Sequence, residues 1–241
     1  MGLKALVKKH RADLVIANGE NIADGFGITG ELAETLFSQG ITVITTGNHV
    51  WQKREVLPSL DSKERLLRPA NFPPGTPGRG YCVIDVKGTK IAVINLQGRE
   101  KMSPIDCPFR TAREILKKVR QETRSIFIDF HAESTEEKEA LAFYLDGNVT
   151  AVVGTHTHVQ TADERILPKG TAYITDMGMT GPTNSVIGVS VDIALERSLT
   201  QMPLKMTAAD SEASICGVVI QFNPDQGKAL SIERIAESLS C

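Results

Sequence analysis

The chain has 241 residues, 41% of them hydrophobic, so it is long and apolar enough to bury a full core as one domain over residues 1–241. Lys and Arg number 27 against 29 Asp and Glu, and the formal net charge of −2 provides no basic field for long nucleic acid or an anionic membrane. Four cysteines form no C-x-x-C pair, which is typical of free thiols in a reducing compartment. We therefore expect a cytoplasmic protein that binds neither long nucleic acid nor a membrane. The four cysteines are Cys82, Cys107, Cys216 and Cys241.

The first third of the chain alternates helical and extended patterns. Apolar spacing predicts helices over 3–10 and 28–37, the second closed by Gly40, and apolar runs predict strands over 14–17 and 42–46. The next segments are a charged helical piece that ends at Leu60 and an irregular loop rich in Pro and Gly over 68–80.

The remaining elements favour sheets. A hairpin is predicted over 81–95, followed by an amphipathic helix over 112–119. Ser134 and Glu137 have the spacing of a capping box, which predicts a helix that Gly147 ends. Further strands are expected over 149–153, 171–175, 215–222 and 229–235. The pattern predicts an α/β protein with two mixed sheets packed face to face and helices outside, a four-layer α/β/β/α sandwich.

Polar residues of the kinds that bind metals follow four of the apolar runs. His156 and His158 come directly after the run 149–153, and their spacing of two places both imidazoles on one side of an extended segment. The other three stretches are Asn18-Gly19-Glu20-Asn21, Gly47-Asn48-His49 and His131-Ala132-Glu133. Since open α/β sheets place their ligands at strand ends, we expect these side chains to converge.

The candidate metal ligands are Glu20, Asn21, Asn48, His131, His156 and His158. Mixed nitrogen and oxygen ligands suit Fe, Mn or Zn. The set exceeds what one tetrahedral ion uses, but two ions roughly 3.5–4 Å apart would use all of it, with Glu20 as the bridge. Such a pair activates a bridging water to hydroxide and neutralises phosphoryl oxygens, and His49 is placed to protonate the leaving oxygen.

Each candidate also has an ordinary structural interpretation. Asn21 and Asn48 are residue types common in turns, and His131 alone would suit a satisfied buried position. Phe26 and Trp51 would suit either a pocket for a base or the core. The nearby carboxylates are expected to support the site or the structure rather than to bind metal; they are Asp129, Glu133 and Asp163.

These motifs closely resemble the YmdB-like branch of the calcineurin-type metallophosphoesterases, from Gly2 nearly to the C-terminus. The resemblance rests on the four stretches above, on Arg68-Pro69-Ala70-Asn71 and on the segment 154–164. It implies a bacterial phosphodiesterase that converts 2',3'-cyclic nucleotides to 3'-nucleotides with two Fe or Mn ions. The resemblance also implies that the protein forms homo-oligomers.

The resemblance assigns roles by position. Glu20 resembles the bridging ligand, and His49 resembles the proton donor. Asn21 and His158 would join Glu20 on the first metal, whereas the second metal would be held by Asn48, His131 and His156.

One departure from the family pattern affects the expected site. The family opens with a strand that ends in Gly-Asp-x-x-Gly, whose Asp is a ligand of the first metal, and this sequence begins just after that segment. We expect the sandwich to lack that strand. The alternative to an active enzyme is therefore a catalytically weak nucleotide- or protein-binding regulator with the same fold. Within the enzyme class, a phosphomonoesterase or a nuclease is the other possibility.

Overall fold

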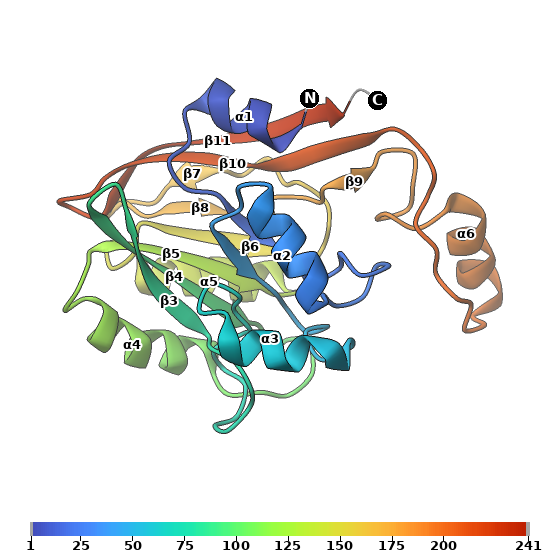
Figure 1. Ribbon diagram of the computed structural model, residues 1–241, viewed down its shortest axis with the longest axis horizontal. Helices are drawn as coiled ribbons and strands as arrows, with labels where there is room; N and C mark the ends of the chain where they lie inside the picture. Colours follow the sequence, from blue (N-terminus) through green and yellow to red (C-terminus); the bar gives the residue numbers. More distant parts are fainter. Residues whose placement is uncertain (1, 240–241) are drawn as a thin grey trace.

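A six-stranded mixed sheet forms the centre of the computed structural model, which describes residues 2–239 (Figure 1). Its strand order is β3-β4-β5-β6-β8-β7, with β4, β5, β6 and β8 parallel and an antiparallel strand at each edge. The six strands are β3 (Tyr81–Val86), β4 (Thr89–Gln97), β5 (Ser125–His131), β6 (Ala151–Thr155), β7 (Arg165–Ile166) and β8 (Ala172–Ile174).

Two helices cover one face of this sheet. Helix α4 (Pro108–Val119) directs one apolar stripe at the strands, and α5 (Thr135–Leu145) lies beside it in the same core cluster. Ser134 caps α5 by accepting a hydrogen bond from the backbone N–H of Glu137. The Glu137 side chain accepts from the backbone N–H groups of Arg99 and Glu100 instead of closing the capping box. The helix over these residues was predicted from the same cap.

The opposite face of the sheet packs against a second layer of strands. This layer contains a parallel pair, β1 (Ile16–Asn18) with β2 (Val43–Thr45), and a three-stranded sheet in the order β11-β10-β9. The latter strands are β9 (Gly181–Pro182), β10 (Ala213–Asn223) and β11 (Lys228–Leu239). Apolar side chains of both layers meet between them, with Phe127 edge-on against Phe222. Burial of this surface from both sides holds the two layers together.

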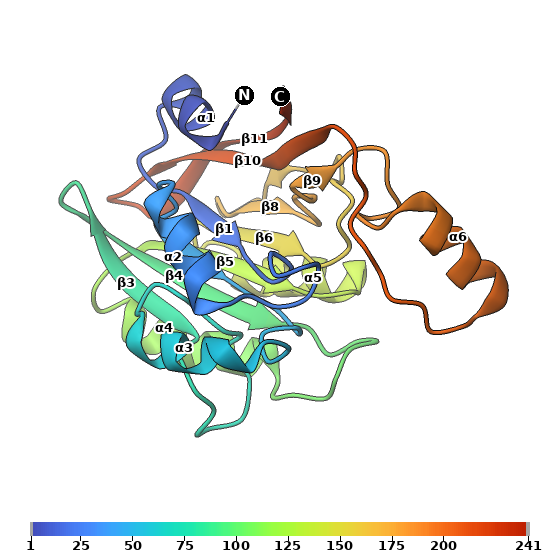
Figure 2. The ribbon, with the colours of Figure 1, turned by 45° about the vertical axis from the view of Figure 1, so that its right-hand side comes forward.

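Helices also lie outside the second layer. Helices α2 (Gly30–Ser38) and α3 (Leu57–Ser62) share a core cluster with β2, and a 3-10 turn, η1 (Arg54–Val56), leads into α3. Helix α1 (Leu3–His10) lies beside β11, where Lys9 pairs with Glu237 (Figures 1 and 2). The predicted four-layer α/β/β/α architecture is confirmed.

One helix lies apart from the body of the protein. Helix α6 (Val191–Thr200) projects to one side and has no buried residue (Figure 2). The sequence pattern did not predict it, nor the two-residue strands β7 and β9, because none of the three buries a recognisable apolar face. Within residues 2–239, no helix is both long and apolar enough to cross a bilayer.

Candidate metal centre

The site lies where strands of both layers end. β5 and β6 run parallel with His131 opposite Thr155, and β1 and β2 run parallel with Asn18 opposite Thr45. Side chains alternate along a strand, so Asp129 and His131 share the face of β5 that looks toward β1 and β2. The polar residues after the four strands therefore meet between the two layers, as the sequence predicted.

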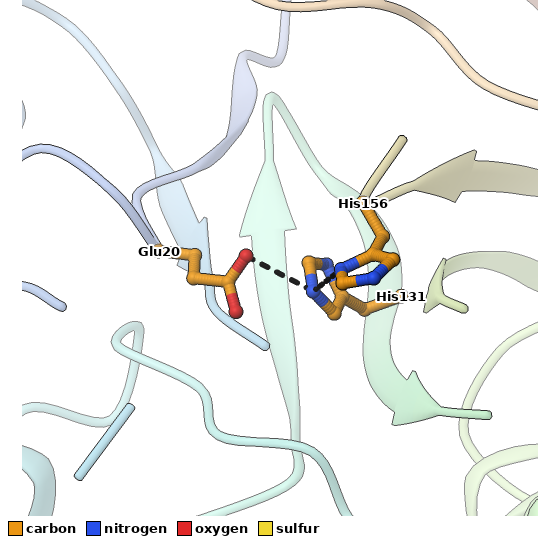
Figure 3. A group of neighbouring side chains, drawn as sticks. All are labelled: Glu20, His131 and His156. Carbon is orange, nitrogen blue, oxygen red and sulfur yellow. Dashed lines mark hydrogen bonds and ion pairs between the residues drawn. The ribbon is translucent and has the colours of Figure 1, made fainter. Parts of the chain in front are cut away.

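Glu20, His131 and His156 form the centre of the site (Figure 3). Their candidate ligand atoms all lie within 4.8 Å of one another. Nε2 of His131 is 2.9 Å from Oε2 of Glu20 and 3.0 Å from Nδ1 of His156. Glu20 and His131 are each about 1% exposed, so these two groups lie away from bulk water.

The hydrogen bonds of His131 identify the nitrogen that faces the cluster as a lone-pair donor. The hydroxyl of Thr155 donates a hydrogen bond to Oδ1 of Asp129 at 2.7 Å. The hydroxyl oxygen of Thr155, Oγ1, also lies 3.0 Å from Nδ1 of His131. Thr155 Oγ1 therefore accepts the Nδ1–H of the imidazole, and neutral His131 carries its lone pair on Nε2. That lone pair faces a carboxylate oxygen of Glu20 and an oxygen of Asn48 that is 3.0 Å away. Electron pairs that converge in this way fit a shared cation, which is the arrangement of a metal site.

Gly47 allows the ligand stretches to approach so closely. A Cβ atom at this position would lie 2.4 Å from Nε2 of His131 and 2.5 Å from Oε1 of Glu20. A side chain there would displace one of the two groups. The glycine before Asn48 is therefore required by the geometry of the cluster itself.

The other three predicted site residues form a branch beside the cluster. Oδ1 of Asn21 lies 3.0 Å from Nδ1 of His49, and Nδ2 of Asn21 lies 3.1 Å from Nε2 of His158. The backbone N–H of His49 donates to Oε1 of Glu20 at 2.9 Å, which joins this branch to the centre. All seven predicted residues thus lie in one connected group; they are Glu20, Asn21, Asn48, His49, His131, His156 and His158.

The pKa shifts follow from burial and charge within the site. Burial raises the pKa of Glu20, but the attraction and hydrogen bond that the imidazolium form of His131 supplies, together with the contacts of His49, outweigh it, so the pKa falls from 4.5 to about 2. Burial lowers the pKa of His49 below 6.5, against the attraction of Glu20. At neutral pH Glu20 is therefore a carboxylate, the protonation state in which it binds metals.

Supporting contacts surround the cluster. Asp129 accepts hydrogen bonds from Thr45 and, at 3.0 Å, from Nδ2 of Asn18, which ties β5 to β1 and β2. Nδ1 of His158 lies 3.2 Å from the carbonyl oxygen of Ile187. The sequence pattern assigns no role to Asn18, Thr45 or Ile187; for Ile187 the contact is made by a backbone carbonyl, which the residue type does not reveal.

The residues with two possible interpretations differ in their surroundings. Phe26 packs edge-on against His49 with ring centroids 5.0 Å apart, whereas Trp51 packs against Phe72 in the cluster under α2 and α3. Glu133 lies 3.1 Å from Nε2 of His156. Asp163 accepts hydrogen bonds from the backbone and side chain of Thr175, so it supports the chain after β8. Phe26 is therefore the aromatic residue next to the site.

The fold and the cluster define a class: an α/β sandwich with a buried, mixed nitrogen and oxygen site of the metal-binding type at its strand ends. The sequence model of the family described as YmdB-like protein matches residues 1–235, and the chain belongs to this family.

Known relatives agree with this assignment. The chain is 49% identical over 230 residues to the 2',3'-cyclic-nucleotide 2'-phosphodiesterase of Bacillus subtilis, covering 95% of this chain and 87% of the relative. A crystal structure of a hypothetical protein from Thermus thermophilus superposes with a TM-score of 0.90 at 40% identity, covering 96% and 90% of the two chains. A phosphatase from Mycoplasma pneumoniae superposes with a TM-score of 0.92 at 35% identity, covering 98% and 86%.

Proposed function

We propose that this protein is a metal-dependent phosphodiesterase that hydrolyses 2',3'-cyclic nucleotides to 3'-nucleotides. The observation that carries the proposal is the convergence of lone pairs from Glu20, Asn48 and His131 on one buried point between the two sheets. The extensive similarity to the Bacillus subtilis phosphodiesterase supports the substrate class.

The proposed ligands divide into two groups around Glu20. Asn21 and His158, which contact each other at 3.1 Å, would hold one ion with the carboxylate. The second ion would be held by Asn48, His131 and His156, whose contacts all involve Nε2 of His131. We propose Fe or Mn as the metal, because imidazole, carboxylate and amide oxygen together suit these ions. When bound, the two ions activate water and neutralise charge on the phosphoryl oxygens.

His49 is the proposed proton donor. Hydrolysis adds water to phosphorus and breaks the bond between phosphorus and the 2' oxygen, which must leave with a proton. Nδ1 of His49 faces Asn21 and Glu20, so in the protonated imidazole Nε2 is the atom that delivers that proton. The products are then a free 2' hydroxyl and a 3' phosphate, and the atoms balance with one water consumed.

The other proposals concern setting and partners. The substrate is a small nucleotide rather than long nucleic acid, a proposal supported by the net charge of −2. The family match over 1–235 supports one domain. A cytoplasmic location and self-association stay predictions. The alternative of a catalytically weak regulator is not favoured, because the Bacillus subtilis relative is a phosphodiesterase and the metal-type cluster is assembled.

The proposal is tested by a panel of substrates given to the Mn²⁺-loaded and the chelator-treated protein. The panel contains a 2',3'-cyclic nucleotide, a 3',5'-cyclic nucleotide, a short oligonucleotide and a phosphomonoester. We expect metal-dependent turnover of the 2',3'-cyclic nucleotide above the other three. Preference for the oligonucleotide or the phosphomonoester would contradict the proposed substrate.

A further inference from the structure

A buried ion pair lies behind the loop that carries His156 and His158. Lys138 of α5 and Asp176, which follows β8, are each 0% exposed, and Nζ of the lysine is 3.1 Å from Oδ2 of the carboxylate. Neither residue belongs to the proposed ligands. A buried pair of this kind has a large desolvation cost, so its position calls for an explanation.

The carboxylate of the pair is bonded to the residue between the two histidines. Oδ2 of Asp176 accepts from the backbone N–H of Thr157 at 2.9 Å and from its hydroxyl at 2.8 Å. Oδ1 accepts from the backbone N–H of Gly178 at 2.9 Å. Thr161 makes two more bonds of 3.0 Å with the backbone of Asp176, so the loop after His156 is fastened at two points.

The loop needs such fastening because its backbone is strained. His156 has φ 105° and His158 has φ 65°, both in the left-handed region that residues with a side chain rarely adopt. Strain of this kind persists only where surrounding contacts enforce it, and it clusters at functional sites. Thr157 is the residue through which the ion pair enforces it.

We propose that Lys138 and Asp176 are positioning residues that hold His156 and His158 in their metal-binding arrangement by clamping Thr157. The lysine holds the carboxylate in position, and the carboxylate fixes the N–H and hydroxyl of Thr157. The two imidazoles on either side of Thr157 are thereby turned toward the cluster. This inference rests on the proposed function, because it assigns the clamp a role in binding metal.

The test measures Mn²⁺ affinity of the metal-free protein by titration calorimetry, with the thermal midpoint measured in parallel. Thr157→Val removes the hydroxyl bond and keeps the branched shape, and Thr157→Ser restores the hydroxyl. We expect Thr157→Val to weaken binding roughly 10- to 100-fold, as is typical when a partner of a metal ligand is lost, and Thr157→Ser to bind nearly as wild type. Asp176→Asn, which removes the charge from both bonds, is expected to weaken binding at least as much.

Thr171→Val is the matched control. The hydroxyl of Thr171 is buried and bonds to the carbonyl of Val149 and the N–H of Gly147, at the opposite ends of β6 and β8. This control should lower the thermal midpoint and leave Mn²⁺ affinity unchanged. Equal affinity of wild type and Thr157→Val would overturn the clamp alone, whereas a wild-type chain that binds no Mn²⁺ would contradict the proposed metal site itself.

Discussion

Nδ1 of His49 lies 3.0 Å from Oδ1 of Asn21, so the side chain of the proposed proton donor is oriented by a residue proposed to bind metal. An amide oxygen only accepts hydrogen bonds, so the imidazole must carry its proton on Nδ1. The other ring nitrogen, Nε2, is left to exchange a proton with the substrate. This division suits the proposed role of His49 as a proton donor rather than a metal ligand.

Replacing His49 tests that role. We expect His49→Ala to lower kcat for a 2',3'-cyclic nucleotide about 10²- to 10⁴-fold, the range associated with loss of a general acid. Because Nδ1 of His49 also contacts the proposed ligand Asn21, kcat is compared at saturating Mn²⁺, with Mn²⁺ affinity measured in parallel. His10→Ala, on α1 and outside the cluster, is the matched histidine control. Full activity of His49→Ala would refute the assignment.

The close approach at Gly47 gives a second prediction. In Gly47→Ala the new methyl group would lie 2.4 Å from Nε2 of His131, so the ligands must separate. We expect Mn²⁺ affinity to fall at least tenfold by calorimetry. Gly217→Ala in β10 is the control, since its Cβ would meet only Ile235, at an ordinary 3.7 Å. Unchanged affinity in Gly47→Ala would show that the cluster does not bind the ion.

The residue types of the site could be predicted from the sequence, but part of its support could not. His156 and His158 are visible because imidazoles are rare in this chain and follow an apolar run. Lys138 lies among charged residues in the sequence of α5, which is typical of a solvent-exposed lysine, yet it is fully buried. Only the packing of α5 against the loop after β8 shows that its charge has a partner.

The strands were predicted better than their grouping into sheets. The hairpin of β3 and β4 follows from two apolar runs around a turn, and each run suffices to identify its strand. The pairing of β4 with β5, however, joins two strands that α4 separates in the sequence, and a local sequence pattern does not reveal such a pairing. Helix α6 was not predicted, and in the structure, which describes residues 2–239, none of its residues is buried.

The pKa of His156 predicts how the metal-free protein responds to acid. Burial and the imidazole of His131 lower the pKa of His156 from 6.5 to about 4, outweighing Glu20 and Glu133. The unfolded chain therefore binds a proton that the folded chain does not, and the free energy of unfolding falls as the pH drops from about 6.5 to about 4. Urea unfolding with a chelator should show a smaller pH slope for His156→Gln; equal slopes would contradict the shift.

Two thiols should differ in reactivity. Burial raises the pKa of Cys82 to about 11. Burial also acts on Cys107, but hydrogen bonds from the backbone at Arg110 and Phe109 outweigh it and lower the pKa below 9.0. Because the thiolate is the nucleophile, iodoacetamide should modify Cys107 well before Cys82, as followed by peptide mass spectrometry. Earlier modification of Cys82 would contradict the predicted order. Cys241 lies outside the described residues.

The most direct test of the central claim is the product that the Mn²⁺-loaded protein forms from 2',3'-cyclic AMP, compared with Glu20→Gln. The account predicts that wild type forms 3'-AMP and loses this activity when the metal is chelated. Glu20→Gln removes the proposed bridging carboxylate, so it should bind Mn²⁺ weakly and turn over at least 100-fold more slowly, a loss of about 2.7 kcal/mol in transition-state stabilisation. Wild-type protein that binds Mn²⁺ yet forms no product, or forms 2'-AMP, would contradict the account.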